Sequence, residues 1–364
     1  MTLEITKFIN DNSDWEAKLA DAPYFVKTKR TGDFVLLKYS QLNSDFNLPI
    51  VRECRGIILD ESDNYRPVCV PFFKFGNVGE RYVPEIDWTT ARVQEKIDGS
   101  LIKVWHHKGM WRISSNGEID ARNANIYSTP MAKVPSTNLR TLFDEAWSKT
   151  GVAMNSLNKD YTYMFELTSP HNRVIVRYEE TTIRHIGTRN NHTLFECDMD
   201  IGVLKPLIFP FAALTECIES AKQLGHSDEG YVVTDQHFNR VKLKSPSYVA
   251  LSYLAQGVTT HTKVVEIIQK NEQSEFLSYF PEYKDIFDEA LRLIDEFSAR
   301  QSVELEEIRA KQFASRKELA EAVAKSDCPE CLFVLIDGKE PNARSWLLSR
   351  PAAKVLRYIG LEGD

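Results

Sequence analysis

Short runs of apolar and β-branched residues, separated by turn-forming residues, dominate the chain from about residue 34 to residue 244. Runs of this length and composition are typical of β-strands. The runs that we predict as strands are FVLLKY (34–39), RGIIL (55–59), SLIKVWHH (100–107), MWRIS (110–114), YTYMFEL (161–167), RVIVRY (173–178), TIRHIG (182–187), GYVVTD (230–235) and RVKLK (240–244). The short connections after the third and eighth runs predict hairpins, so we expect antiparallel sheets.

Helical spacing appears at two places inside this region and throughout the part that follows it. After residue 252, apolar residues recur at intervals of four, three and four, as on one face of an amphipathic helix. These residues are Ile286, Ala290, Leu293 and Phe297. The helices that we predict elsewhere are 138–150, 211–224, 303–313, 316–325, 331–336 and 343–359, the last kinked near Pro351.

Length and composition then set the number of domains. A chain of 364 residues is too long for one compact core, and 43% hydrophobic with 27% charged residues is ordinary globular usage. The change of pattern near residue 250 predicts a first domain at 1–250 and a second at 251–364. The fold class that we expect is α+β, with antiparallel sheets and flanking helices, followed by an all-α C-terminal domain.

The N-terminal sequence, the lack of long apolar stretches and the net charge limit the compartments and binding partners that we expect. The start, MTLEITKFIN, lacks the apolar centre of a signal peptide, and no stretch approaches the roughly 20 apolar residues that cross a bilayer. We therefore expect a cytoplasmic protein with no membrane partner. The net charge is −7, with 30 basic and 32 acidic residues before residue 246 and 15 and 20 after it. Any nucleic-acid site must be a local basic patch.

The most informative string is EKIDGSL (95–101), in which Lys96 precedes Asp98 by two residues at the start of a predicted strand. One interpretation is a polar turn before an exposed hairpin. The other is that Lys96 is a nucleophile whose amine points into a cleft. An ordinary lysine is protonated at neutral pH, so attack requires nearby like charges or partial burial.

A second string, RVKLK, places two lysines on one face of a predicted strand. Lys242 and Lys244 are two residues apart, so both face one side while Val241 and Leu243 face the other. Paired lysines repel each other, and a polyphosphate between them would relieve that repulsion. The alternative is an ordinary solvated strand face.

In chain order, these motifs resemble those of the covalent nucleotidyltransferase superfamily, which contains ATP-dependent ligases and capping enzymes. The strings that resemble its first, third, fourth and fifth motifs are KIDG (96–99), FE (165–166), DEGYVV (228–233) and VKLK (241–244). Those that resemble more specifically the RNA ligase 1 class of T-even phages are ECRGI (53–57), KF (74–75), SPHNR (169–173) and KLKS (242–245). The resemblance implies a nucleotidyltransferase, or ATP-grasp-like ligase, core over 1–250.

The implied function is that of an ATP-dependent RNA ligase, which joins a 5′-phosphate to a 3′-OH through a lysyl-adenylate and an adenylylated RNA end. The implied cofactors are ATP and Mg²⁺, for which Mn²⁺ can substitute. The implied partner is RNA with such ends, with cleaved tRNA expected as the substrate of a monomer in the cytoplasm, or the host cytoplasm of a phage-encoded protein. A helical tail in place of an OB-fold favours this interpretation. A GTP-using capping enzyme and a catalytically silent RNA-binding relative remain the alternatives.

The resemblance also assigns roles to single residues. It implies that Lys96 is the nucleophile, that Glu166 binds the ribose and that Glu229 binds the metal. Phosphate or nucleotide contacts are implied for Lys38, Arg55, Lys74, Lys242 and Lys244. For Asp98 two alternatives remain open: it orients the loop that carries Lys96, or it assists in binding the metal.

Three positions depart from the pattern of the resembled class. Asn116 stands where relatives can carry a lysine, which puts one phosphate contact in doubt. Gly76 stands where a second Phe often follows Lys-Phe, which leaves Phe75 as the aromatic residue there. Lys38 aligns only loosely with a nucleotide-contacting tyrosine, and Tyr39 is beside it.

Overall fold

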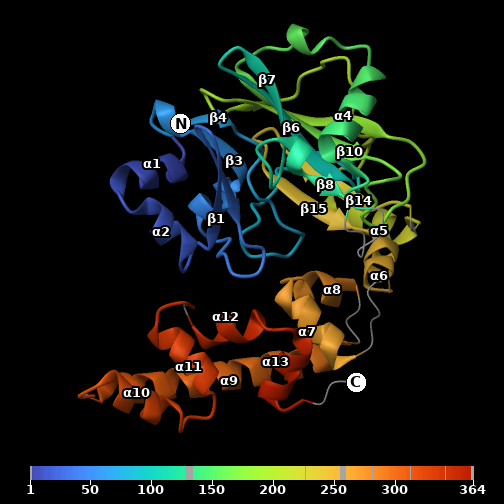
Figure 1. Cartoon of the computed structure of the whole chain (residues 1–364). Coiled ribbons are helices and arrows are strands. Elements are labelled where there is room, and N and C mark those ends of the chain that lie inside the picture. Colours follow the sequence, from blue (N-terminus) through green and yellow to red (C-terminus); the bar gives the residue numbers. More distant parts are fainter. Residues whose placement is uncertain are drawn as a thin grey trace. The chain divides into compact units, whose positions relative to one another are not determined.

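The computed structural model describes residues 2–127, 134–225, 227–254, 260–279, 283–311, 313–340 and 342–361 (Figure 1). They form two compact units, of which unit 1 comprises 1–20, 26–40 and 45–252, and unit 2 comprises 21–25, 41–44 and 253–364. The strands of the described chain all lie in unit 1. Helix α6 (Pro246–Leu254) crosses the division. The roles assigned to the two expected domains stay predictions.

The first sheet of unit 1 has the order β1-β2-β3-β4 and is antiparallel throughout. Its strands are β1 (Val26–Thr31), β2 (Phe34–Tyr39), β3 (Arg55–Asp60) and β4 (Arg66–Cys69). The helices before and between them are α1 (Glu4–Asp11), α2 (Trp15–Ala20) and α3 (Pro49–Glu53). The Glu53 carboxylate accepts hydrogen bonds from the Glu4 and Ile5 backbone N–H groups. The last residue of α3 thus provides acceptors for N–H groups in the first turn of α1 that have no partner within the helix.

The second sheet has the order β12-β11-β10-β6-β7. Its strands are β6 (Ser100–His107), β7 (Met110–Ser115), β10 (Tyr161–Thr168), β11 (Thr182–Asn190) and β12 (Glu196–Cys197). The predicted hairpin between β6 and β7 turns at Lys108 and Gly109, both with positive φ, which matches a two-residue turn. Helix α4 (Leu139–Ser148) packs on this sheet, with Phe143 against Phe165 in one buried core. Smaller elements near it are β8 (Asn125–Ile126), β9 (Thr137–Asn138) and single 3₁₀ turns at Glu61–Asp63, Ala121–Asn123 and Met154–Ser156.

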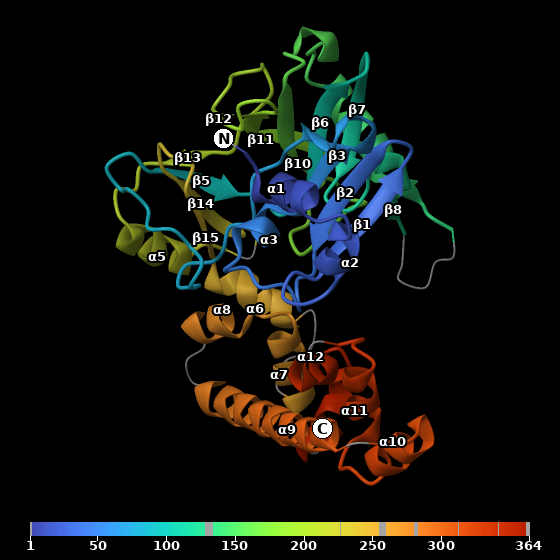
Figure 2. The same ribbon diagram turned by 90° about the vertical axis from the view of Figure 1, so that its left-hand side faces the viewer.

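The third sheet has the order β13-β5-β14-β15, and its inner strands lie side by side in Figure 2. Its strands are β5 (Arg92–Lys96), β13 (Ile208–Phe209), β14 (Gly230–Thr234) and β15 (Arg240–Lys244). One face packs against α5 (Leu214–Gln223) through a core that contains Val93, Tyr231, Val241 and Leu243. Lys242 and Lys244 therefore project from the opposite face, and the predicted alternation is confirmed.

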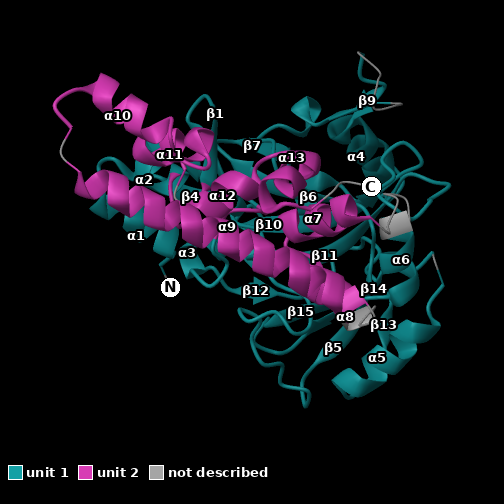
Figure 3. Ribbon diagram, turned by 90° about the horizontal axis from the view of Figure 1, so that it is seen from below, with its two compact units in different colours: residues 1–20, 26–40, 45–252 teal, residues 21–25, 41–44, 253–364 magenta. Residues whose placement is uncertain are grey.

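Unit 2 is built from helices (Figure 3, magenta). They are α7 (His261–Gln269), α8 (Gln273–Tyr279), α9 (Lys284–Ala310), α10 (Arg316–Val323), α11 (Pro329–Ile336), α12 (Ala343–Leu348) and α13 (Ala352–Ile359). The longest, α9, joins two predicted helices into one of 27 residues. Of its predicted stripe, Ala290 and Phe297 are buried as expected, whereas Phe287 and Ile294 are buried in place of Ile286 and Leu293.

The fold class is confirmed, with antiparallel sheets, flanking helices and a helical C-terminal part. Two element predictions were wrong. The segment 343–359 is two helices rather than one, divided near the predicted kink: α12 ends at Leu348, and Pro351, which lacks a backbone N–H, is the N-cap residue of α13. The run RVIVRY is not a strand, for a reason that lies in the site described below. Among the described helices, none combines the length and apolarity that crossing a membrane requires.

Candidate active site

Lys96 ends strand β5 and forms an ion pair with Glu229. Its Nζ donates a hydrogen bond to Glu229 Oε2 over 2.6 Å, and the two side chains are 20% and 4% exposed. Glu229 directly precedes β14, which pairs with β5, so the two residues lie at the same edge of the third sheet. A carboxylate at this distance can both hold the ammonium and receive its proton.

Strand register places the paired lysines on the same sheet face as Lys96. Lys96, Gly230 and Lys244 are opposite one another on three adjacent strands, and Gln94, Val232 and Lys242 form the next row. A strand spacing of about 4.8 Å puts the Lys96 and Lys244 backbones roughly 10 Å apart. No side chain of residue 230 stands between them, since it is glycine.

Gly230 is required at this position by its backbone. Its φ is +139°, which residues with a side chain rarely adopt. A Cβ there would overlap the Leu243 carbonyl oxygen and lie 2.8 Å from the Lys244 Cα. The glycine therefore lets β15 approach β14 closely and brings Lys244 beside Lys96.

A cavity of about 350 Å³ opens at this face, and we call it the Lys96 cavity. Lys96, Glu166 and Arg55 line it together with Phe75 and Asn116. These residues come from different elements: Lys96 from β5, Glu166 from β10 and Arg55 from β3. The Arg55 guanidinium carbon lies 5.2 Å from the ring centres of both Phe72 and Phe75. A cation held on aromatic faces is positioned without being neutralised.

Glu166 has a perturbed pKa. Burial raises the pKa of its carboxyl to about 7, and the negative charge of Glu229 adds to the shift. The charges of Lys96 and Arg55 and a hydrogen bond from the Gly99 backbone act in the opposite direction. A carboxyl that titrates near neutral pH inside a cavity is typical of functional sites.

Asp98 orients the loop that follows Lys96. Its Oδ2 accepts the backbone N–H groups of Ile175 and Val176 over 2.8 and 2.7 Å, and its Oδ1 accepts the Tyr248 hydroxyl over 2.8 Å. Both oxygens are thus occupied by the protein, which favours the orienting role over metal binding. The same bonds explain why RVIVRY is not a strand, since its central N–H groups bind Asp98.

Lys38 lies near the Lys96 cavity without lining it. It stands opposite Arg55 in the β2–β3 register, and its Nζ lies 3.3 Å from where a Cβ of residue 117 would be. Tyr39 points to the other face of β2, where its ring lies 5.0 Å from that of Phe46. Of the two neighbours, Lys38 is therefore the one on the side of Arg55.

Lys103 is a cation that sequence reasoning missed. It is fully buried in β6, donates to the Gly56 carbonyl, and lies near Asn116. Burial, together with the positive charges of Arg55 and Lys38, lowers the pKa of Lys103 to about 8. Asn116 Oδ1 is buried without a hydrogen-bond partner in the described chain. A lysine from another strand thus supplies positive charge next to the position where the expected lysine is replaced.

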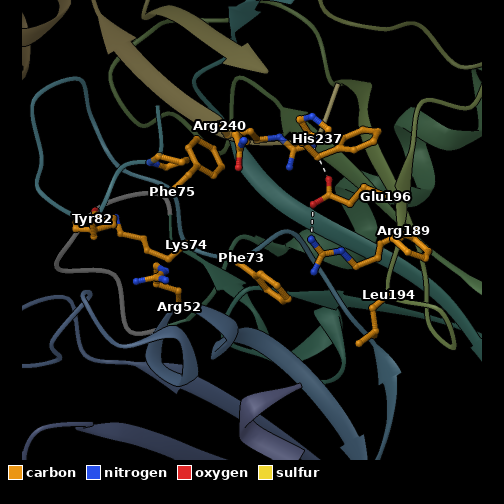
Figure 4. Close-up of a pocket in the computed structure, with 14 residues that line it drawn as sticks. Arg52, Phe73, Lys74, Phe75, Tyr82, Arg189, Leu194, Glu196, His237 and Arg240 are labelled. Atoms are coloured by element: carbon orange, nitrogen blue, oxygen red, sulfur yellow. Dashed lines mark hydrogen bonds and ion pairs between the residues drawn. The ribbon is translucent and has the colours of Figure 1, made fainter. Parts of the chain in front are cut away.

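Lys74 lines a second cavity of about 400 Å³, which we call the Phe195 cavity (Figure 4). Phe75 and Arg240 line both cavities, so the two adjoin. The Lys74 Nζ lies 5.0 Å from the ring centre of Phe46. The Gly76 departure has a steric reason, because a Cβ there would lie 2.6 Å from a Val83 methyl group.

The predicted residues therefore separate into groups. Lys96, Glu166 and Arg55 line one cavity, with Glu229 bonded to Lys96. Lys242 and Lys244 lie on the same sheet face as Lys96. Lys38 lies beside Arg55, and Lys74 lies in the adjoining Phe195 cavity. The residues that sequence reasoning missed are Lys103, Arg240 and Tyr248. No motif or spacing marks Lys103 or Tyr248, whereas Arg240 alternates with Lys242 and Lys244 in RVKLK, which places it on their sheet face.

The carboxylates suit a hard divalent cation. In the part of the chain that the structure describes, no three His, Cys, Asp or Glu side chains form a metal site. Mg²⁺ does not need such a cage, since it binds one or two carboxylates together with phosphates and water. Glu229, the predicted metal ligand, is such a carboxylate, and a cation bound to it would also offset the negative charge by which it raises the pKa of Glu166.

A lysine amine paired with a carboxylate, beside a cavity with a second carboxyl and an arginine, is the arrangement that the resemblance to the covalent nucleotidyltransferase class predicts. Residues 53–248 match the RNA ligase family. The chain belongs to this family, which confirms the resemblance drawn from its motifs.

Individual relatives agree. The chain is 31% identical over 277 residues to a putative bifunctional polynucleotide kinase/RNA ligase of Autographa californica nuclear polyhedrosis virus, covering 72% of this chain and 39% of that protein. It is 30% identical over 190 residues to an RNA ligase of Rhodothermus phage RM378, covering 45% and 43%. The chain thus spans about two fifths of these relatives. Among solved structures, an archaeal ATP-dependent RNA ligase aligns over 79% of each chain with 13% identity and a TM-score of 0.43.

Proposed function

We propose that the chain is an ATP-dependent RNA ligase that joins 5′-phosphate and 3′-OH ends. The observation that carries the proposal is the Lys96–Glu229 pair at 2.6 Å, whose lysine lines a cavity together with Glu166 and Arg55. Displacement at phosphorus needs an aligned nucleophile and positive charge around the phosphates more than other covalent machinery. This cavity offers both.

The first step makes the lysyl-adenylate. The Lys96 ammonium gives a proton to Glu229 Oε2, and the neutral amine attacks the α-phosphorus of ATP. A P–N bond forms, the bond from the α-phosphorus to the bridging oxygen breaks, pyrophosphate leaves, and the nitrogen loses a second proton to solvent. Lys242 and Lys244, on the same sheet face, stabilise the charge on the phosphates. Glu166 accepts hydrogen bonds from the ribose.

The next two steps transfer the adenylate and seal the RNA. An oxygen of the RNA 5′-phosphate attacks the same phosphorus, the P–N bond breaks, and Lys96 regains its protons. A 3′-hydroxyl oxygen then attacks the RNA phosphorus, losing its proton, and AMP leaves. Mg²⁺ held by Glu229, with Mn²⁺ as a substitute, would neutralise phosphate charge when bound.

The natural substrate that we propose is broken tRNA. Unit 2 is helical and its residues carry more acidic than basic side chains, so extensive contact with the RNA backbone is disfavoured there. Recognition of a folded RNA by shape, through a few contacts, suits such a surface.

The test is covalent labelling. Protein is incubated with ATP or GTP labelled at the α-phosphate, with Mg²⁺, and run on a denaturing gel. We expect label from ATP, reduced at least about 10³-fold in Lys96→Ala. The adenylated protein is then offered nicked tRNA, single-stranded RNA and nicked DNA, with sealing expected for RNA and most efficient for nicked tRNA.

The other outcomes favour the alternatives. Label from GTP alone indicates a capping-type enzyme. No label from either nucleotide, with intact binding of RNA, indicates a catalytically silent RNA-binding relative. Sealing of nicked DNA in preference to RNA contradicts the substrate class.

A further inference from the structure

The Phe195 cavity has an excess of positive charge. Arg52, Lys74, Arg189 and Arg240 line it, whereas Glu196 is the one carboxylate among its described lining residues. Glu196 is buried between two of these cations, with an ion pair to Arg189 and one of 2.6 Å to Arg240. One carboxylate cannot neutralise four cations, so the cavity is built for an anion.

One of the cations is incompletely satisfied. The Arg189 side chain is 5% exposed, and its Nε and Nη1 have no hydrogen-bond partner in the described chain. Figure 4 shows Arg189 on the cavity wall, directed toward Glu196. Its guanidinium carbon lies 4.1 Å from the Phe73 ring centre, which fixes the ring in the wall. Buried donors without acceptors are costly, and they raise the positive potential inside the cavity.

The cavity also carries aromatic surface. Phe195 is 67% exposed although it is a large apolar side chain, and Phe73, Phe75 and Phe238 line the same cavity. Exposed aromatic rings next to arginine and lysine are typical of surfaces that bind unpaired nucleotides, since the ring stacks on a base and the cations bind the phosphate.

We infer that the Phe195 cavity binds the 5′-phosphorylated terminal nucleotide of the RNA, with its base stacked on Phe195. The inference rests on the proposed ligase function and names a subsite for its second substrate. In an in-line displacement the RNA phosphate approaches the α-phosphorus from the side opposite the Lys96 amine. A cavity that shares Phe75 and Arg240 with the Lys96 cavity, but does not include Lys96, can hold that phosphate.

The test measures RNA binding without catalysis. In a Lys96→Ala background, a short single-stranded RNA with a 3′ fluorophore and either a 5′-phosphate or a 5′-OH is titrated by fluorescence anisotropy. We expect tighter binding of the 5′-phosphate form, and a loss of about tenfold in Phe195→Ala, the worth of one stacked base. Phe195→Trp should restore the affinity. Tyr127→Ala is the matched control, since Tyr127 is 46% exposed and lines neither cavity.

A second measurement separates this subsite from the ATP site. With Lys96 intact, Phe195→Ala should slow transfer of AMP to the RNA while the labelling of Lys96 by ATP is retained. Equal RNA affinity in Phe195→Ala and its parent, or equal binding of the 5′-phosphate and 5′-OH forms, would overturn the inference. So would a parallel loss of labelling, which would assign the cavity to ATP. Because the binding assay needs no catalysis, it distinguishes this failure from failure of the ligase function.

Discussion

The Lys96 cavity and the Phe195 cavity adjoin through Phe75 and Arg240, yet they are built from different kinds of backbone. The reacting groups of the first stand on or next to strands of three sheets, as Lys96 does on β5 and Glu166 on β10. Most of the second is lined by loop residues, including those at 73–75, 194–195 and 237–239. Strands hold reacting atoms in position to within a fraction of an ångström. Loops let a binding surface adapt to substrates of varying sequence.

The most severe change to the strand-built cavity is Gly230→Ala. The added Cβ would overlap the Leu243 carbonyl at a φ of +139°, so β14 and β15 cannot pair as they do. We expect a loss of at least about 3 kcal/mol in the free energy of unfolding, measured by urea denaturation, and no lysyl-adenylate.

Gly109→Ala is the matched control. Gly109 also has a positive φ, of +79°, but nothing lies within 4 Å of a Cβ there. It should cost about 1 kcal/mol from backbone strain alone, with labelling retained. Equal losses in the two variants would show that the close approach of β15 is not what requires Gly230.

Two buried carboxylates sharpen the comparison, Glu229, which is bonded to Lys96, and Glu196, which lines the Phe195 cavity. Glu229→Gln leaves Lys96 without its proton acceptor, so we expect lysyl-adenylate formation to fall by about 10² to 10³-fold with little change in thermal midpoint. Glu196→Gln leaves Arg189 and Arg240 buried beside a neutral amide, so it should cost on the order of 3 kcal/mol in the free energy of unfolding. The reverse result, a stability loss in Glu229→Gln and none in Glu196→Gln, would contradict the roles assigned to them.

Asp98→Asn tests whether the loop after Lys96 must be anchored. The amide keeps one acceptor oxygen, so it can accept from the 175–176 backbone only if its NH₂ group faces the Tyr248 hydroxyl, which must then accept instead of donate. We expect lysyl-adenylate formation to fall by about 10 to 100-fold, with the affinity for ATP changed less, because the loop positions the nucleophile. Tyr248→Phe removes a single bond and should cost less than Asp98→Asn. A larger loss of ATP affinity than of rate would contradict the positioning role.

The strands of unit 1 show how much of the fold could be predicted from the sequence. The strands at 34–39, 100–107 and 240–244 were predicted with their observed bounds, because short runs rich in apolar and β-branched residues form strands. In 240–244 one face is buried, whereas 34–39 and 100–107 each bury four consecutive residues. RVIVRY has the same composition and failed, since its backbone donors bind Asp98, a contact that spans 77 residues of sequence.

The site was predictable to the extent that its residues belong to motifs. Lys96 and Glu229 stand in recognisable strings, and the structure brings them to 2.6 Å. Lys103 occupies an alternating position of an ordinary strand, and the Phe195 cavity is assembled from separate loops. No local pattern marks either one, because each depends on which segments meet in the folded chain.

The smallest effect that we expect concerns pH. Burial and the charge of Glu229 raise the pKa of Glu166 to about 7, so its carboxyl is mostly protonated at pH 6 and mostly ionised at pH 8. An ionised carboxylate accepts ribose hydroxyls more strongly than a neutral carboxyl, by about 1 kcal/mol. The affinity for AMP should therefore rise about fivefold from pH 6 to pH 8, as measured by calorimetry. The AMP phosphate also titrates in this pH range. Glu166→Gln is therefore the control, because its pH dependence reports the contribution of the phosphate alone. Parallel pH profiles for the two proteins would mean that the ionisation of Glu166 is not linked to ribose binding.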